Sequence, residues 1–109
     1  KPLSVAEALQ QPRTPQEQVY EAIIEDLQFA AKNLPDKKNE RFVGAANEDA
    51  ANTLLGKVYL TIGDKGKAEE SLLKVYGKFS LVPYGDLWDT AKKNGVESIF
   101  EIQYMGGEI

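Results

Sequence analysis

Residues 50–72 read AANTLLGKVYLTIGDKGKAEESL, two amphipathic segments joined by Gly63-Asp64. Apolar residues recur every three or four positions on both sides of this dipeptide, which is the spacing of helices with one buried face. Glycine ends helices well because it adopts the left-handed conformation, and aspartate begins them by capping free N–H groups. The segment therefore predicts two antiparallel helices, over about 48–62 and 65–77, joined by a very short turn.

The spacing within these two helices matches much of the tetratricopeptide repeat. In that repeat a Leu-Gly pair, a Tyr, an Ala and a large apolar residue mark the positions where one helix packs into its neighbour. Asn52 stands where the repeat has Trp, and Val75 where it has a small residue, so the pair is tetratricopeptide-like rather than a consensus repeat. The positions that match form a helix-packing signature of Leu55, Gly56, Tyr59, Ala68 and Leu72.

A longer helix is predicted before this hairpin, over about 15–34. The TPQE sequence at 14–17 supplies an N-cap threonine, a proline at the first helical position and a glutamate that completes a capping box. Apolar residues then recur in helical steps as far as Leu34, where Pro35 disfavours a further turn. The residues before this helix are expected to form an extended arm with one helical turn, and 35–46 a solvated loop.

The C-terminal part of the chain carries a different pattern. Residues 98–104 read SIFEIQY, in which apolar and polar side chains alternate. Alternation at every second position is typical of a strand with one buried face, which would carry Phe100, Ile102 and Tyr104. The fold class is therefore predicted as mostly α, with tetratricopeptide-like antiparallel hairpins and a short β-strand over about 98–104.

The composition fits one small domain and limits the available chemistry. The chain has 109 residues and a net charge of −4, from 13 basic and 17 acidic residues that are scattered along it. Nucleic-acid binding is disfavoured because it needs a local excess of positive charge. The sequence has neither Cys nor His, which excludes disulfides, zinc thiolate sites, imidazole metal ligands and Ser-His-Asp triads.

The ends of the sequence suggest a piece of a longer protein. It begins with Lys1-Pro2, and its predicted strand has no visible pairing partner. No apolar run approaches the ~20 residues that a membrane-spanning helix needs. We expect 1–109 to be a single helical segment of a larger chain.

Carboxylates remain as candidate catalytic groups, since glycoside hydrolysis uses a pair of them. The closest pairs in sequence are Asp86 with Asp89 and Glu97 with Glu101. Simpler roles are available, because Asp86 can cap a helical turn and Glu101 falls on the outward face of the predicted strand. We therefore predict no catalytic residue, no metal site and no cofactor, and a protein that is not an enzyme.

Aromatic side chains are the remaining candidates for ligand contact. Sugars present C–H faces that stack on Tyr and Trp rings, whose polar tips can also hydrogen-bond. Tyr20, Tyr59 and Tyr76 fall on apolar helical stripes and are predicted to pack in the core. Three other aromatic residues are candidate glycan contacts, although plugging the end of the helical core is an alternative role for the first two: Tyr84, Trp88 and Tyr104.

The chain as a whole resembles the SusD/RagB family of outer-membrane nutrient-binding lipoproteins from Bacteroidetes. Four blocks carry the resemblance, in the family's order and spacing. They are VYEAIIEDL at 19–27 with Leu34-Pro35, AANTLLGKVYL at 50–60 with Gly63-Asp64 and Lys67-Ala68, FSL at 79–81 with Tyr84 and Leu87-Trp88, and ESIFEIQY at 97–104.

This resemblance implies a tetratricopeptide-like scaffold within a surface protein that captures glycans or their breakdown products without cleaving them. It also implies an oligosaccharide as ligand, a SusC-like TonB-dependent transporter as partner, and attachment to the outer membrane through a lipid anchor. Two features depart from the family. The lipidated Cys is absent from this segment, and the segment stops where the ligand-bearing C-terminal portion would begin, which implies that the glycan site lies mostly outside it.

A tetratricopeptide-like adaptor for protein–protein interaction is the alternative function. It would bind a peptide in the groove between helices, and it rests on the repeat pattern of residues 50–72 alone. Such adaptors usually need three or more stacked repeats, whereas one hairpin matches here.

Overall fold

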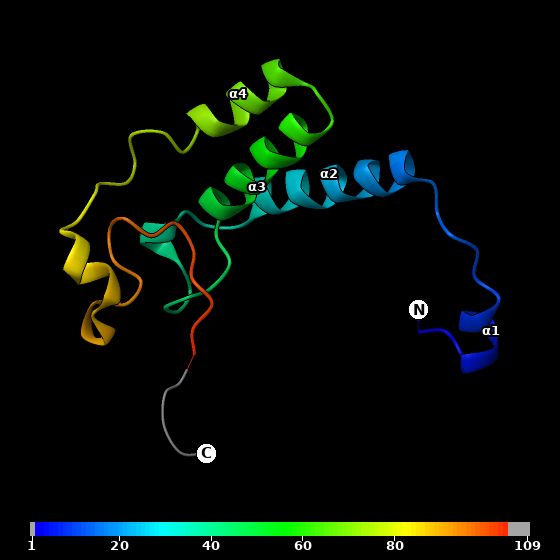
Figure 1. The fold of residues 1–109 in the computed structure, drawn as a ribbon, viewed down its shortest axis with the longest axis horizontal. Helices are drawn as coiled ribbons and strands as arrows, with labels where there is room; N and C mark the ends of the chain where they lie inside the picture. Colours follow the sequence, from blue (N-terminus) through cyan, green and yellow to red (C-terminus); the bar gives the residue numbers. More distant parts are fainter. Residues whose placement is uncertain (1, 105–109) are drawn as a thin grey trace.

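The structure, a computed structural model, describes residues 2–104, and that part of the chain is mainly helical. Three helices pack side by side, α2 (Gln16–Asn33), α3 (Glu48–Thr61) and α4 (Lys65–Leu73), with α3 in contact with both of the others (Figure 1). The short α1 (Val5–Leu9) stands apart at the end of the N-terminal arm. Three 3₁₀ helices complete the described elements: η1 (Lys37–Asn39), η2 (Tyr84–Trp88) and η3 (Thr90–Lys92).

Local signals in the sequence build the hairpin of α3 and α4. Asn47 begins α3, because its side-chain oxygen accepts the backbone N–H of Ala50 at 2.7 Å. Gly63 follows α3 with a φ of 87°, in the left-handed region that glycine adopts without strain. Asp64 then caps α4 by accepting the backbone N–H of Lys67 at 3.1 Å. One glycine and one aspartate thus reverse the chain.

The core lies where α3 meets its two neighbours. Leu55 and Tyr59 of α3 and Ala68 of α4 are buried together, and α2 covers them with Ile24, Leu27 and Ala31. Gly56 lies against α4, since a Cβ built there would be 2.5 Å from Leu72 Cγ. The signature residues of the tetratricopeptide-like pattern therefore lie at the contact between helices.

Two of the predicted helices begin or end at other residues in the structure. Helix α2 covers 16–33 rather than 15–34, and its N-cap is Pro15 without a side-chain bond, so the capping box expected at Thr14 is wrong. The predicted helix over 65–77 ends at Leu73. Because the chain leaves the helical path there, and Gly77 has a φ of 86°, Tyr76 is 84% exposed rather than buried.

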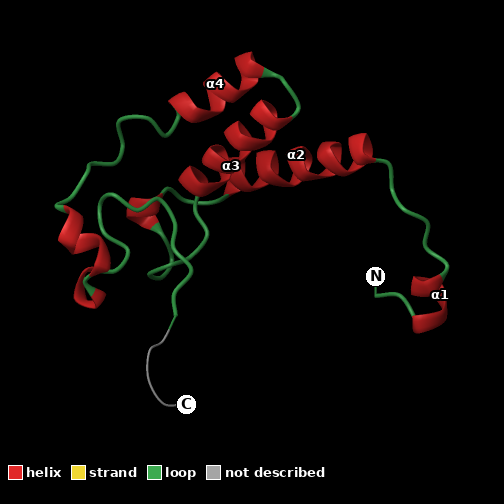
Figure 2. Cartoon of the chain, in the orientation of Figure 1, coloured by secondary structure: helices red, strands yellow, loops and turns green. Residues whose placement is uncertain are grey.

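The predicted strand over 98–104 is wrong: this segment has no regular secondary structure, and no strand occurs in residues 2–104 (Figure 2). Phe100, Ile102 and Tyr104 are exposed rather than buried on an inner face. The physical reason is the absence of a partner strand, since a strand is stabilised by hydrogen bonds to a neighbour. Side chains bind the backbone of 95–99 instead, as described below.

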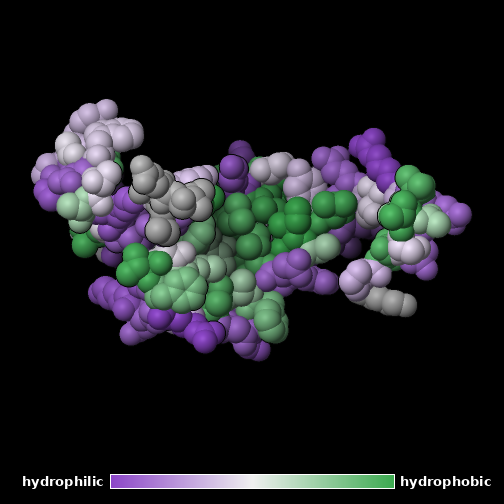
Figure 3. Space-filling model, turned by 90° about the horizontal axis from the view of Figure 1, so that it is seen from below, coloured by the Kyte–Doolittle hydropathy of each residue, from purple (hydrophilic) through white to green (hydrophobic). Residues whose placement is uncertain are grey.

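The overall shape is open. The radius of gyration is 17.6 Å, against about 13 Å for a compact domain of this length. Seen from below, the molecule shows a band of apolar side chains across its middle (Figure 3). None of the described helices is long and apolar enough to cross a membrane.

Replacing Gly56 with alanine is expected to lower the free energy of unfolding by up to about 2 kcal/mol, because the strain of forcing Leu72 out of its position exceeds the gain in helix propensity. Gly66→Ala is the matched control within α4, where a Cβ meets nothing closer than 3.9 Å. That control is expected to stabilise the protein by about 0.5–1 kcal/mol through helix propensity. Urea unfolding measures both, and stabilisation by Gly56→Ala would contradict the close approach.

Asn52 occupies the position of the repeat's Trp and is buried with a side-chain oxygen that has no hydrogen-bond partner. An unpaired buried acceptor costs about 1–3 kcal/mol. Asn52→Leu is therefore expected to raise the unfolding free energy by about 1 kcal/mol. Asn33→Leu is the control at an exposed position, where the amide is paired with the carbonyl of Phe29 at 2.7 Å, and it is expected to give no gain in stability. A loss of stability in Asn52→Leu would contradict the prediction.

Candidate functional site

The structure brings two of the predicted glycan contacts together in η2. The rings of Tyr84 and Trp88 lie edge to face, with centroids 5.8 Å apart and an angle of 65° between their planes. Both are open to solvent, at 74% and 70% exposure, so the interpretation of these residues as a plug in the helical core does not fit. The pair presents two aromatic faces that are open to a ligand.

Tyr104, the third predicted glycan contact, does not join this pair. Its side chain is 77% exposed, and its backbone carbonyl accepts a hydrogen bond from Lys93 Nζ at 3.0 Å. Among the described residues, the aromatic contact in this region joins Tyr84 and Trp88 alone.

An exposed ion pair lies beside the aromatic pair. Lys92 Nζ is 2.8 Å from Asp86 Oδ1 and 4.0 Å from Asp89 Oδ2. The hydrogen bond to Asp86 raises the pKa of the Lys92 ammonium above its ordinary value. Asp89 also caps η3 through the backbone N–H of Ala91. Asp86 lies within η2, so it does not cap that turn as the sequence suggested.

The second pair of candidate carboxylates is likewise engaged by backbone groups. Glu97 accepts the N–H of Val82 at 2.7 Å, and Glu101 accepts the N–H of Asn94 at 2.8 Å. Burial raises the pKa of Glu101, but hydrogen bonds from Asn94, Ser98 and Gln103, with the charge of Lys37, outweigh it, so this pKa lies below its ordinary value. These contacts give both carboxylates a structural role.

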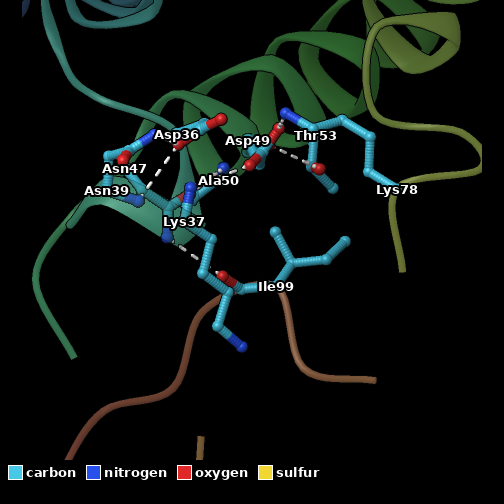
Figure 4. A network of polar contacts seen from close by, with 9 residues as sticks. All are labelled: Asp36, Lys37, Asn39, Asn47, Asp49, Ala50, Thr53, Lys78 and Ile99. Carbon is cyan, nitrogen blue, oxygen red and sulfur yellow. Dashed lines mark hydrogen bonds and ion pairs between the residues drawn. The ribbon is translucent and has the colours of Figure 1, made fainter. Parts of the chain in front are cut away.

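A buried polar network at the start of α3 is the feature that sequence reasoning missed (Figure 4). Asp49 is 1% exposed, accepts the backbone N–H of Lys37 at 3.0 Å and forms an ion pair with Lys78. The hydrogen bond to Asp49 raises the pKa of the Lys78 ammonium. Asn47 Nδ2 donates to the carbonyl of Ile99 at 3.0 Å. Only the cap at Asn47 could be anticipated, because the other partners are distant in sequence.

Lys37 extends this network to the C-terminal part of the chain. Its ammonium donates to the carbonyl of Gly95 at 2.7 Å and to that of Ser98, and it lies 5.8 Å from the ring centre of Phe79. Burial lowers the pKa of Lys37, although Glu40, Glu101 and Asp49 oppose that shift. The sequence placed this residue in a solvated loop, since its partners lie 58 and 61 positions away.

An open apolar groove of about 460 Å³ lies between α2, α3 and the chain at 99–100. Its walls include Leu27 of α2, Leu34 just after that helix, Leu54 of α3, and Phe100. Among the described residues, no cluster of acidic side chains is arranged to hold a metal ion.

Comparison with known proteins finds one informative similarity. The chain is 38% identical over 101 aligned residues to SusD-like protein P2 of Formosa agariphila. The alignment covers 86% of this chain but 20% of that relative. No protein-family model matches the chain, and no solved structure matches it. The similarity relates the chain to SusD-like proteins, of which it spans about a fifth of the length.

Acid is expected to loosen the segment around Glu101. Because the pKa of Glu101 is depressed in the folded state, its ionised form adds stability above the ordinary value of 4.5, and this stability is lost as the pH falls through the folded-state pKa. Glu101→Gln is expected to reduce the acid sensitivity of Trp88 fluorescence, while Glu21→Gln on the exposed face of α2 does not. Identical acid titrations for Glu101→Gln and the native protein would contradict this.

Proposed function

We propose that this chain is the helical scaffold segment of a non-catalytic, carbohydrate-binding lipoprotein of the outer membrane. Such a protein captures glycans at the cell surface and passes them to a SusC-like TonB-dependent transporter. The observation that carries this proposal is the 38% identity to a SusD-like protein across 86% of the chain. The helical hairpin and the engaged state of all four candidate carboxylates agree with binding rather than bond cleavage.

Within this role the packed helices position other elements, and the pair of Tyr84 and Trp88 offers contact area to a sugar. Two exposed rings at 65° fit the C–H faces of adjacent sugar units better than a single flat ring. Because the chain spans 20% of its relative, most glycan contacts are proposed to come from the rest of the protein.

A peptide-binding adaptor is the second candidate function. The observation in its favour is the open apolar groove between α2 and α3, which has the form that accommodates an apolar peptide segment. The test below includes an outcome that supports it.

The test measures oligosaccharide binding by the full-length protein that contains this segment, using calorimetry against a panel of glycans. Binding without release of shorter products is expected. The double change of Tyr84→Ala and Trp88→Ala is expected to weaken binding about tenfold, which corresponds to about 1.4 kcal/mol. Tyr76→Ala, another tyrosine that is largely exposed, is the matched control and leaves affinity unchanged.

Each other outcome has a defined meaning. Hydrolysis of the oligosaccharide would refute the non-catalytic role. Peptide binding without any glycan binding would favour the adaptor. Unchanged affinity in the double variant would remove Tyr84 and Trp88 from the site while leaving glycan capture intact. Incorporation of labelled fatty acid in cells would support the lipid anchor.

A further inference from the structure

The aromatic pair belongs to a segment that lacks a core of its own. We call residues 80–101 the aromatic lobe. Among the described residues, buried side chains end at Val75, and none lies in the lobe. Its regular structure consists of η2 and η3, which are too short to be stable alone. Apolar contact with the scaffold is limited to Ile99 and Phe100, which line the groove beside α2 and α3, so burial alone does not explain why the lobe has a defined position.

Two side chains of the scaffold hold the backbone of the lobe. Asn47 Nδ2 donates to the carbonyl of Ile99 at 3.0 Å, while the oxygen of the same amide caps α3. Lys37 donates to the carbonyls of Gly95 and Ser98, with 2.7 Å to the former. Lys37 is itself held beside α3, because its backbone N–H binds the buried carboxylate of Asp49. Three backbone carbonyls of the lobe, within residues 95–99, are thus held beside the start of α3.

Contacts within the lobe carry this fixation to the aromatic pair. The N–H of Ser80 donates to the carbonyl of Val96 at 3.3 Å, and the N–H of Val82 donates to the Glu97 carboxylate at 2.7 Å. Val82 lies two residues before Tyr84, which begins η2. On the other side, Lys92 joins η3 to η2 through Asp86. The stretch that Asn47 and Lys37 hold is therefore tied to the backbone just before Tyr84, and the pair of Lys92 and Asp86 joins the two 3₁₀ helices of the lobe to each other.

We propose that Asn47 and Lys37 are positioning residues that together set the place of the aromatic lobe on the helical scaffold. Without them the lobe loosens as a unit, held by the remaining contact of Asn94 Nδ2 with Glu40 Oε1 at 2.9 Å. Helices α2, α3 and α4 stay packed, because the core does not include any lobe residue. Their effect on glycan affinity rests on the function proposed above. Their effect on the position of the lobe is independent of that function and can be measured without a ligand.

The test uses one variant for each contact. Asn47→Ser keeps a neutral helix cap, since serine caps about as well as asparagine, but removes the donor to Ile99. Lys37→Met removes the ammonium and keeps an unbranched apolar stem. Hydrogen exchange of the amides in 80–101 is expected to accelerate roughly tenfold in each variant, with exchange in α3 and α4 unchanged. Trp88, the single tryptophan of the chain, is expected to lose fluorescence anisotropy.

Matched controls separate positioning from general destabilisation. Lys38→Met changes the neighbouring lysine, whose side chain makes no hydrogen bond within residues 2–104. This variant is expected to leave exchange in the lobe unchanged. Asp64→Ser makes the corresponding change at the cap of α4 and is expected to leave the lobe unchanged. Lys37→Arg retains a cationic donor and is expected to restore much of the protection.

Either of two results would overturn the proposal. One is native exchange and anisotropy in both Asn47→Ser and Lys37→Met. The other is equal acceleration in the lobe and in α3, which would mean loss of the whole fold. In the full-length protein, weaker glycan binding by both variants extends the proposal to the ligand. A protein that binds no glycan but releases its lobe in these variants would refute the proposed function alone.

Discussion

At Gly56 the backbone of α3 lies directly against the side chain of Leu72, because no Cβ separates the two helices. This contact sets the distance between α3 and α4, and hence how deeply Tyr59 and Ala68 are buried between them. Helix α2 closes the other side of the same cluster with Ile24 and Leu27. A core with so few residues tolerates little change in volume, since each methylene lost or added affects a large part of its packing.

Beyond this core, directional polar contacts determine the arrangement of the chain. Asn47 connects the helical core to the aromatic lobe, because its amide oxygen caps α3 and its amide nitrogen donates to the carbonyl of Ile99. The buried carboxylate of Asp49 also connects separate segments, because it accepts the backbone N–H of Lys37 and forms an ion pair with the ammonium of Lys78. Removing one partner of such a pair leaves a buried group unsatisfied, which costs more than an average hydrogen bond contributes. The helical core therefore responds to changes in volume, and the aromatic lobe to the loss of donors.

The parts of this structure that the sequence predicts are those fixed by short-range contacts. Asn47, Gly63 and Asp64 act on groups within three residues, so the hairpin of α3 and α4 could be located from them. Residues 98–104 have the alternation of a strand, but a strand also needs a neighbour, and the described chain supplies side-chain donors instead. The contact of Lys37 with Gly95 spans 58 positions and leaves no local pattern. The contact between Tyr84 and Trp88 could not be predicted either, since the exposure of both rings depends on how the whole lobe is held.

The separation of the core from the aromatic lobe has a consequence for recognition. Binding residues are commonly carried on irregular segments that a rigid scaffold positions. Here the lobe contributes nothing to the buried core, so substitutions at Tyr84 or Trp88 alter the exposed surface without changing core volume. The anchoring groups are mainly backbone carbonyls, which are present whatever the side chains of the lobe are. A scaffold that holds its lobe by main-chain atoms therefore allows the ligand-facing residues to vary while the lobe keeps its position.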